Sequence, residues 1–166
     1  MKKWLFIVVI GIQALYLIGM AASYYVMEDI GKTITLKTAP IDPSDVFYGD
    51  YVRLNYEIST IPEDKWEGDK PSHGGKVYVV VEETESGTYD INRAGVTSFA
   101  TKDKEVQLTA RYDYKEVNRH IVDYGIERYY VEDNTGEQYE DKVGEMVVDV
   151  AIAPWGQKRI LSLRED

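Results

Sequence analysis

The hydrophobic pattern begins with residues 4–27, which carry no charged side chain and directly follow the basic residues Lys2 and Lys3. A helix over this run is about 36 Å long at ~1.5 Å per residue. That length crosses a hydrocarbon core of ~30 Å with some tilt. Basic residues beside a span stay on the cytoplasmic side. The pattern therefore predicts a single-pass anchor over residues 1–27, with a cytoplasmic N-terminus and an extracytoplasmic domain over residues 28–166.

A cleaved signal peptide is the alternative interpretation of this run, because residues 20–23 (Met-Ala-Ala-Ser) offer small side chains to a signal peptidase. The hydrophobic region of such peptides spans ~7–15 residues. This run is longer, which favours an anchor that is retained. A lipoprotein is excluded, because its acylated residue is a cysteine and the chain has none.

Beyond the anchor, hydrophobic and polar residues alternate with a period of two, as half-buried strands do. Residues 62–75 form a charged loop with Pro and Gly, and a short helix capped by Asn134 is expected near 134–143. The segments assigned to strands are 32–38, 51–58, 76–83, 88–92, 96–100, 105–112, 119–131 (bent at Gly125), 145–153 and 158–163, the last two as a hairpin. So many short strands predict a mainly β domain, either an antiparallel β-sandwich or a small barrel.

The charge of the chain is −10 at pH 7. Because Lys2 and Lys3 belong to the anchor, the outer domain carries −10 − 2 = −12. Such a surface repels nucleic acid and anionic headgroups. We expect no nucleic-acid partner, and a domain that stands off the bilayer or meets a basic partner, although charge of this size also serves solubility alone. Without cysteine, disulfides, thiolate metal sites and thiol catalysis are excluded.

The least ordinary stretch is residues 40–56, whose second half reads Gly49-Asp50-Tyr51-x-x-Leu54-x-Tyr56. Gly49 permits a positive φ in a tight turn before the strand, and Asp50 can accept hydrogen bonds from backbone N–H groups there. Alternation places Leu54 and Tyr56 on the inward face. A brace made of a turn and a strand is one interpretation of the stretch, and a binding surface is the other.

Tyr51 and Arg53 face away from the core in this stretch, so a binding surface would be built around them and the neighbouring aspartates. Asp42, Asp45 and Asp50 fall close together and are possible ligands of a hard cation such as Ca²⁺. Their spacing matches no EF-hand loop, and capping explains them more simply. We therefore predict no metal and no cofactor.

A second stretch, residues 124–132, contains Gly125, Glu127, Arg128 and Tyr129. Strand alternation places Glu127 on the same face as Tyr129. If that face is the core, the buried carboxylate needs a partner, and Arg53 is a plausible one. A structural ion pair, a ligand-binding role and acid–base catalysis remain open for Glu127.

Together the two stretches resemble the GDYXXLXY family, named for its motif: the first contains the motif after a Pro-x-Asp-Pro-x-Asp lead-in, and the second resembles the family's Gly-Ile-Glu-x-Phe/Tyr block. The resemblance implies a membrane-anchored bacterial protein with a β-rich outer domain and no established activity. It also implies a role as the companion of a multi-pass membrane protein.

Three functions follow from these observations. The first is a non-enzymatic accessory domain that docks on a multi-pass membrane protein through residues 49–53 and the 62–75 loop. The second is a cell-envelope solute-binding module with a pocket lined by Tyr51, Arg53, Glu127 and Tyr129. The third is a hydrolase that uses Asp50 and Glu127 as paired carboxylates. The chain has two histidines, His73 and His120, which we interpret as solvated surface residues.

Overall fold

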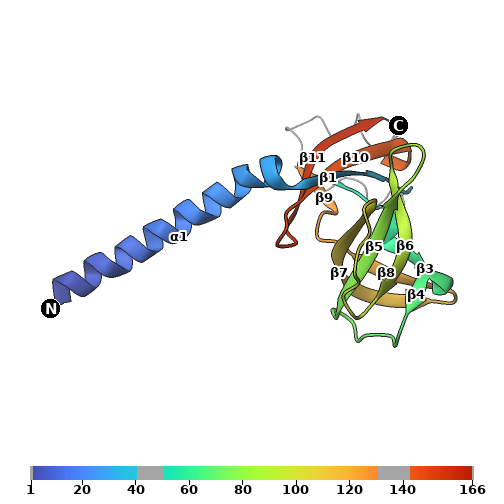
Figure 1. Cartoon of the computed structure of the whole chain (residues 1–166), viewed down its shortest axis with the longest axis horizontal. Coiled ribbons are helices and arrows are strands. Elements are labelled where there is room, and N and C mark those ends of the chain that lie inside the picture. The colour runs from blue at the N-terminus through green and yellow to red at the C-terminus, as the bar shows by residue number, and fades with distance from the viewer. Residues whose placement is uncertain (1, 41–50, 131–142, 166) are drawn as a thin grey trace.

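The computed structural model describes residues 2–40, 51–130 and 143–165. It confirms a mainly β protein with one N-terminal apolar helix, α1 (Lys2–Ile30). The segment Lys3–Met27 of α1 contains an apolar stretch with a mean hydropathy of 2.3 that is not buried against the rest of the protein, whereas Met27 at its end is buried. By length and composition this helix fits a membrane anchor or a signal sequence. It projects from one side of the β domain (Figure 1).

The strands form three sheets, two of them small. β1 (Lys32–Lys37), β10 (Met146–Ile152) and β11 (Lys158–Glu165) form an antiparallel sheet in the order β1-β10-β11. The predicted terminal hairpin is therefore confirmed as β10–β11. β2 (Tyr51–Arg53) pairs with β9 (Arg128–Tyr130) in a two-stranded sheet.

The third sheet has six strands in the order β3-β8-β7-β5-β6-β4 and curls into a nearly closed, barrel-like sheet. All of its pairs are antiparallel except β4–β6, which is parallel. Its strands are β3 (Thr60–Pro62), β4 (Trp66–Glu67), β5 (Lys76–Glu83), β6 (Tyr89–Gly95), β7 (Glu105–Glu116) and β8 (Arg119–Asp123). A small barrel-like sheet of this kind buries one face of its strands without a helical layer.

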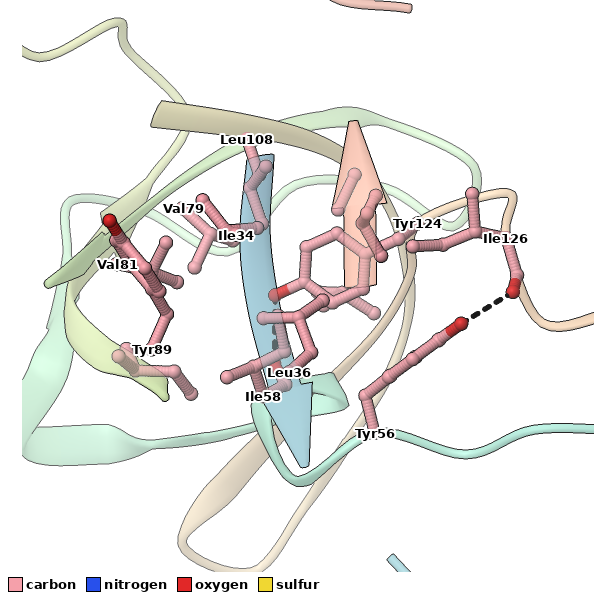
Figure 2. Close-up of a cluster of buried hydrophobic side chains, with 14 of the residues drawn as sticks. Ile34, Leu36, Tyr56, Ile58, Val79, Val81, Tyr89, Leu108, Tyr124 and Ile126 are labelled. Carbon is pink, nitrogen blue, oxygen red and sulfur yellow. Dashed lines mark hydrogen bonds between the residues drawn. The ribbon is translucent and has the colours of Figure 1, made fainter. Parts of the chain in front are cut away.

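One hydrophobic core unites the three sheets, because each contributes side chains to it. Figure 2 shows part of this cluster, with Ile34 from β1 between residues of β5 and β7 and the tyrosines Tyr56 and Tyr124. Its fully buried members include Ile34, Leu36, Val52, Leu54, Tyr56, Ile58, Ile61, Val77, Val79, Val81, Leu108, Tyr112, Val148 and Val150.

The predicted elements differ from the structure in several places, and β3 was not predicted at all. The segment 51–58 keeps its alternating burial, but only β2 is a strand; Tyr56 then forms a single bridge with Thr38, and a 3₁₀ turn, η2, covers Glu57–Ser59. The predicted strand over 96–100 is wrong, because β6 ends at Gly95. The 62–75 loop contains β4 and the 3₁₀ turn η3 (Glu63–Lys65).

A further difference is the predicted strand over 119–131, which is two strands, β8 and β9, separated by a turn. The expected bend at Gly125 is confirmed, since this glycine has a φ of 77°. The predicted helix near 134–143 lies outside the described residues, which resume with a 3₁₀ turn, η4, over Val143–Glu145.

His120 corrects the expectation of two solvated histidines, because its side chain is 1% exposed. The ring stacks on Trp66 with centroids 4.0 Å apart. Its Nε2 lies 2.9 Å from a Glu63 oxygen, and its Nδ1 lies 3.2 Å from the Tyr112 hydroxyl. Both ring nitrogens are thus satisfied, as a buried polar group requires. Burial lowers the pKa of His120, although Glu63 acts in the opposite direction.

Candidate functional site

Strands β2 and β9 bring the two sequence motifs side by side. In their register, Tyr51 lies opposite Tyr130, and Arg53 lies opposite Arg128. These four side chains share the outer face of the pair, because Val52 between them is fully buried. The Tyr51 and Tyr130 ring centroids are 5.9 Å apart, and the Arg128 guanidinium lies 5.2 Å from the Tyr51 centroid. The outer face therefore combines a pair of tilted aromatic rings with arginine side chains.

The turn between β8 and β9 places two carboxylates beside this face. The Gly125 N–H donates a hydrogen bond of 2.6 Å to Asp123, and the Tyr124 N–H donates one of 2.6 Å to Glu127 Oε1. The positive φ of Gly125 lets the chain turn tightly enough for both bonds to form. Asp123 and Glu127 are thus oriented by backbone N–H groups of the same turn.

A cavity of about 570 Å³ opens between the turn and the strand pair. We call it the motif cleft, and its lining residues are Tyr51, Arg53, Asp123, Gly125, Glu127, Arg128 and Tyr130. A second cavity, of about 740 Å³, shares Asp123 and Gly125 with the cleft and continues to Thr109 and Lys158. The Lys158 ammonium donates a hydrogen bond of 2.6 Å to the Thr109 carbonyl.

Burial and the neighbouring Asp123 raise the pKa of Glu127, a carboxyl of the motif cleft, to about 7. Burial is the largest cause, the hydrogen bond with Asp123 and the charge of Asp123 act in the same direction, and the hydrogen bond from the Tyr124 N–H opposes them. Burial lowers the pKa of Lys158, although Glu127 and Asp123 oppose this effect. The cleft can therefore offer both hydrogen-bond donors and acceptors to a bound group.

The raised pKa of Glu127 predicts how Glu127→Gln changes the stability of the fold. Between pH 4.5 and 7 the folded chain keeps a proton at Glu127 that the unfolded chain releases. The stabilising contribution of this carboxyl is therefore complete below pH 4.5 and is lost as the pH rises through 7. Glutamine mimics the protonated form. We expect the variant to be more stable than the wild type above pH 7 by roughly 1–2 kcal/mol, after a discount for partial exposure.

Thermal melting on both sides of this window measures the effect of Glu127→Gln. Glu85→Gln is the matched control, since Glu85 lies exposed in the turn between β5 and β6. We expect that control to show no comparable gain above pH 7. Equal gains in the two variants would show that the effect comes from the net charge and not from the turn of Glu127.

Two buried tyrosines connect the motifs behind the cleft (Figure 2). The Tyr56 hydroxyl donates to the carbonyl of Ile126 at 2.7 Å, and the Tyr124 hydroxyl donates to the carbonyl of Ile58 at 2.8 Å. Each motif thus supplies a tyrosine that satisfies a backbone carbonyl of the other region. The Leu54 N–H adds a third bond, of 2.8 Å, to the carbonyl of Glu127. These bonds fix the position of the turn against the first motif.

The predicted site residues separate into three groups. Tyr51, Arg53, Gly125, Glu127 and Arg128 line the motif cleft. Leu54 and Tyr56 are 1% and 0% exposed, which confirms that they belong to the core. Asp42, Asp45, Gly49 and Asp50 lie outside the described residues, and with them the proposed pair of Asp50 and Glu127.

Two details of the expected pocket differ in the structure. Tyr129 packs against the core, and Tyr130 lines the cleft instead. Arg53 and Glu127 line the same cavity, and the Glu127 carboxylate is hydrogen-bonded to the Tyr124 N–H and to Asp123. The ion pair of Arg53 with Glu127 stays a prediction. Within residues 2–40, 51–130 and 143–165, no three His, Asp or Glu side chains are grouped as a metal site would need.

Both motifs therefore form one structural unit. A comparison with family models finds the same family that the two motifs indicate. The model of the GDYXXLXY protein family matches residues 13–163. The chain belongs to the GDYXXLXY family. Comparisons with curated proteins and with solved structures gave no match. The family match covers nearly the whole β domain and the C-terminal part of α1, so the cleft and the tyrosine bonds fall within the family's extent.

Three residues beside the cleft escaped the sequence analysis of this family member: Asp123, Tyr130 and Lys158. Asp123 precedes Gly125 by two positions, which is the spacing of an aspartate that caps a turn. This spacing in the sequence could have identified Asp123. No local pattern could have identified Tyr130 and Lys158, because their positions depend on the pairing of β9 with β2 and of β11 with β10.

Proposed function

We propose that the chain is a non-enzymatic accessory protein whose outer domain binds a multi-pass membrane protein through the motif cleft. The observation that carries the proposal is the cleft itself, since residues of both family motifs line it. Its outer face is rich in tyrosine and arginine, the residues that dominate binding energy at protein interfaces. Tyr130 is 70% exposed, so a partner can reach this face.

A partner in the same bilayer is favoured by where the cleft lies. Lys158 at the start of β11 lines the cavity that adjoins the cleft. The next residue, Arg159, lies 3.7 Å from the ring centroid of Tyr24, near the end of α1. The cavity that adjoins the cleft is therefore one residue along β11 from a contact with the helix that would hold the domain at the membrane. A protein in that membrane can contact it without a long extension.

Affinity purification of the full chain from mild detergent tests this proposal. We expect the wild type to retain a multi-pass protein, and Tyr51→Ala and Arg128→Ala to lose most of it. Arg119→Ala and Val117→Ala are the controls, because both residues are exposed and lie at the β7–β8 turn. Recovery of the chain alone, or equal retention by all four variants, would remove the basis for a partner at the cleft.

A solute-binding module is the second candidate, and the cavity volume favours it. Small-molecule sites occupy ~300–1,000 Å³, and the motif cleft measures about 570 Å³. A bound solute would raise the melting temperature of the purified chain. A rise with cell-envelope saccharides that disappears in Tyr51→Ala, without any retained protein, would favour this candidate over the first.

A further inference from the structure

The end of α1 is attached firmly to the β10–β11 hairpin. Met27 is 1% exposed and packs in a small cluster with Ala151 and Ala153 of β10 and its turn. The Gly31 N–H donates to the Met27 carbonyl at 3.0 Å and closes the helix end. A Cβ on Gly31 would lie 2.3 Å from the Met27 oxygen and 3.1 Å from the Ile152 oxygen. Only glycine allows so close an approach, so the end of the helix is packed directly against β10.

A contact from β11 extends this attachment one turn further along the helix. The Arg159 guanidinium lies 3.7 Å from the Tyr24 ring centroid, and its Nη1 donates to the Tyr24 carbonyl at 3.5 Å. Such contacts between arginine and an aromatic face are favourable, and more so where water is excluded. The start of β11 is thereby held level with the last helical turns.

This level corresponds to the headgroup layer if α1 spans a bilayer. The Lys3–Met27 segment is about 37 Å long at ~1.5 Å per residue. The hydrocarbon core takes up ~30 Å of that length, and the headgroup layers bring the bilayer to ~40–45 Å. The last turn of the segment, with Tyr24, then lies among the headgroups, where tyrosine and tryptophan concentrate.

The hairpin turn beside this level carries a tryptophan. In Figure 1 the β10–β11 turn reaches back beside the end of α1. Trp155 in this turn is 53% exposed, and its indole N–H donates to the Gln157 side chain at 3.1 Å. Residues 150–161 contain Lys158 and Arg159 and no acidic residue, in a chain with 29 of them, and the Lys158 ammonium is bonded to the Thr109 carbonyl. The turn is thus aromatic and locally basic, although the domain as a whole is acidic.

We propose that the β10–β11 turn is a second membrane contact, in which Trp155 enters the headgroup layer and Arg159 lies level with the phosphates. The occupant of this surface is the bilayer that α1 spans. Two contacts fix the domain at one orientation, with the motif cleft facing a constant direction. This inference depends on the membrane anchor of the proposed function, and goes beyond it by assigning a lipid-binding surface to the outer domain.

Depth-dependent quenching tests the proposal with the full chain in nanodiscs of phosphatidylcholine and phosphatidylglycerol. Because the chain has no cysteine, single cysteines at Pro154, Val117 and Gly11 can each carry one fluorophore. Pro154 is exposed beside Trp155. Val117 is 91% exposed in the β7–β8 turn. A Cβ on Gly11 in α1 meets nothing within 4 Å.

We expect a phospholipid with a nitroxide headgroup to quench the label at Pro154 strongly and the label at Val117 not at all. A nitroxide at the end of the acyl chain should quench the label at Gly11. If Gly11 is quenched and Pro154 is not, the second contact is wrong while the membrane span stands. If Gly11 is not quenched, the span fails, and the proposed function fails with it.

Gly31→Ala separates a fixed contact from a domain that tumbles on a loose tether. The added methyl group collides with the Met27 and Ile152 oxygens, so it should shift the hairpin and reduce quenching at Pro154. Melting curves check that the β domain of this variant stays folded. Undiminished quenching in a folded Gly31→Ala chain would show that the junction does not set the depth of the turn.

Discussion

Leu54→Ala is expected to lower the free energy of unfolding by about 3–5 kcal/mol, because it removes a fully buried side chain and leaves a cavity. Leu54 is 1% exposed, and it lies where the core of the barrel-like sheet meets the strand pair of the cleft. For a domain of this size the loss corresponds to a drop in melting temperature of roughly 10–15 °C. Thermal melting followed by circular dichroism measures it.

Asn55→Ala is the matched control for Leu54→Ala. Asn55 is half-buried, and its backbone carbonyl accepts a bond from the Ala39 N–H that the substitution keeps. We expect a change within about 0.5 kcal/mol, as is usual for residues without a specific role in packing. Equal losses at both positions would mean that Leu54 contributes no more than its exposed neighbours, contrary to the packing described above.

Tyr56→Phe and Tyr124→Phe are expected to destabilise the chain by about 1–3 kcal/mol each, because each leaves a buried carbonyl without its donor. The lost bonds are those to Ile126 and Ile58. Both bonds hold the same turn against the same segment, so the second loss should cost less than the first. A double-mutant cycle should give a coupling energy of about 0.5–3 kcal/mol.

Tyr129→Phe provides the control for the tyrosine pair, because Tyr129 is half-buried next to them. Chemical unfolding of the four variants yields the free energies that the cycle needs. Strictly additive losses from Tyr56→Phe and Tyr124→Phe would contradict the view that the two motifs brace each other. A loss in Tyr129→Phe as large as theirs would point to a general effect of removing a hydroxyl.

Local patterns were sufficient where a segment's burial and hydrogen bonding repeat with one period. The prediction for 76–83 matches β5, and the apolar run matches α1, since each pattern persists over several residues. The segment 51–58 shows the limit. Its alternating burial is real, but burial alone does not supply a partner strand beyond Arg53. A period of two is therefore stronger evidence for a buried face than for strand pairing in a sheet.

Pairings between distant segments explain what the sequence left undetermined. The cleft exists because β2 pairs with β9, across more than 70 positions of the chain, and no local signal sets that register. His120 was expected at the surface, since it lies beside Arg119. It is buried because Trp66, Tyr112 and Glu63 arrive from three other elements and satisfy its ring. Such a burial depends on the tertiary fold.

Site-specific photo-crosslinking in the native membrane tests most directly the claim that the motif cleft is a binding surface for a membrane protein. A photoreactive phenylalanine analogue replaces Tyr51 or Tyr130 in the cleft, and Val117 at the far β7–β8 turn serves as the control position. We expect positions 51 and 130 to form an adduct with the same multi-pass protein, and position 117 to form none. The contrary result is an inserted chain that yields no adduct at position 51, or an equal adduct at position 117.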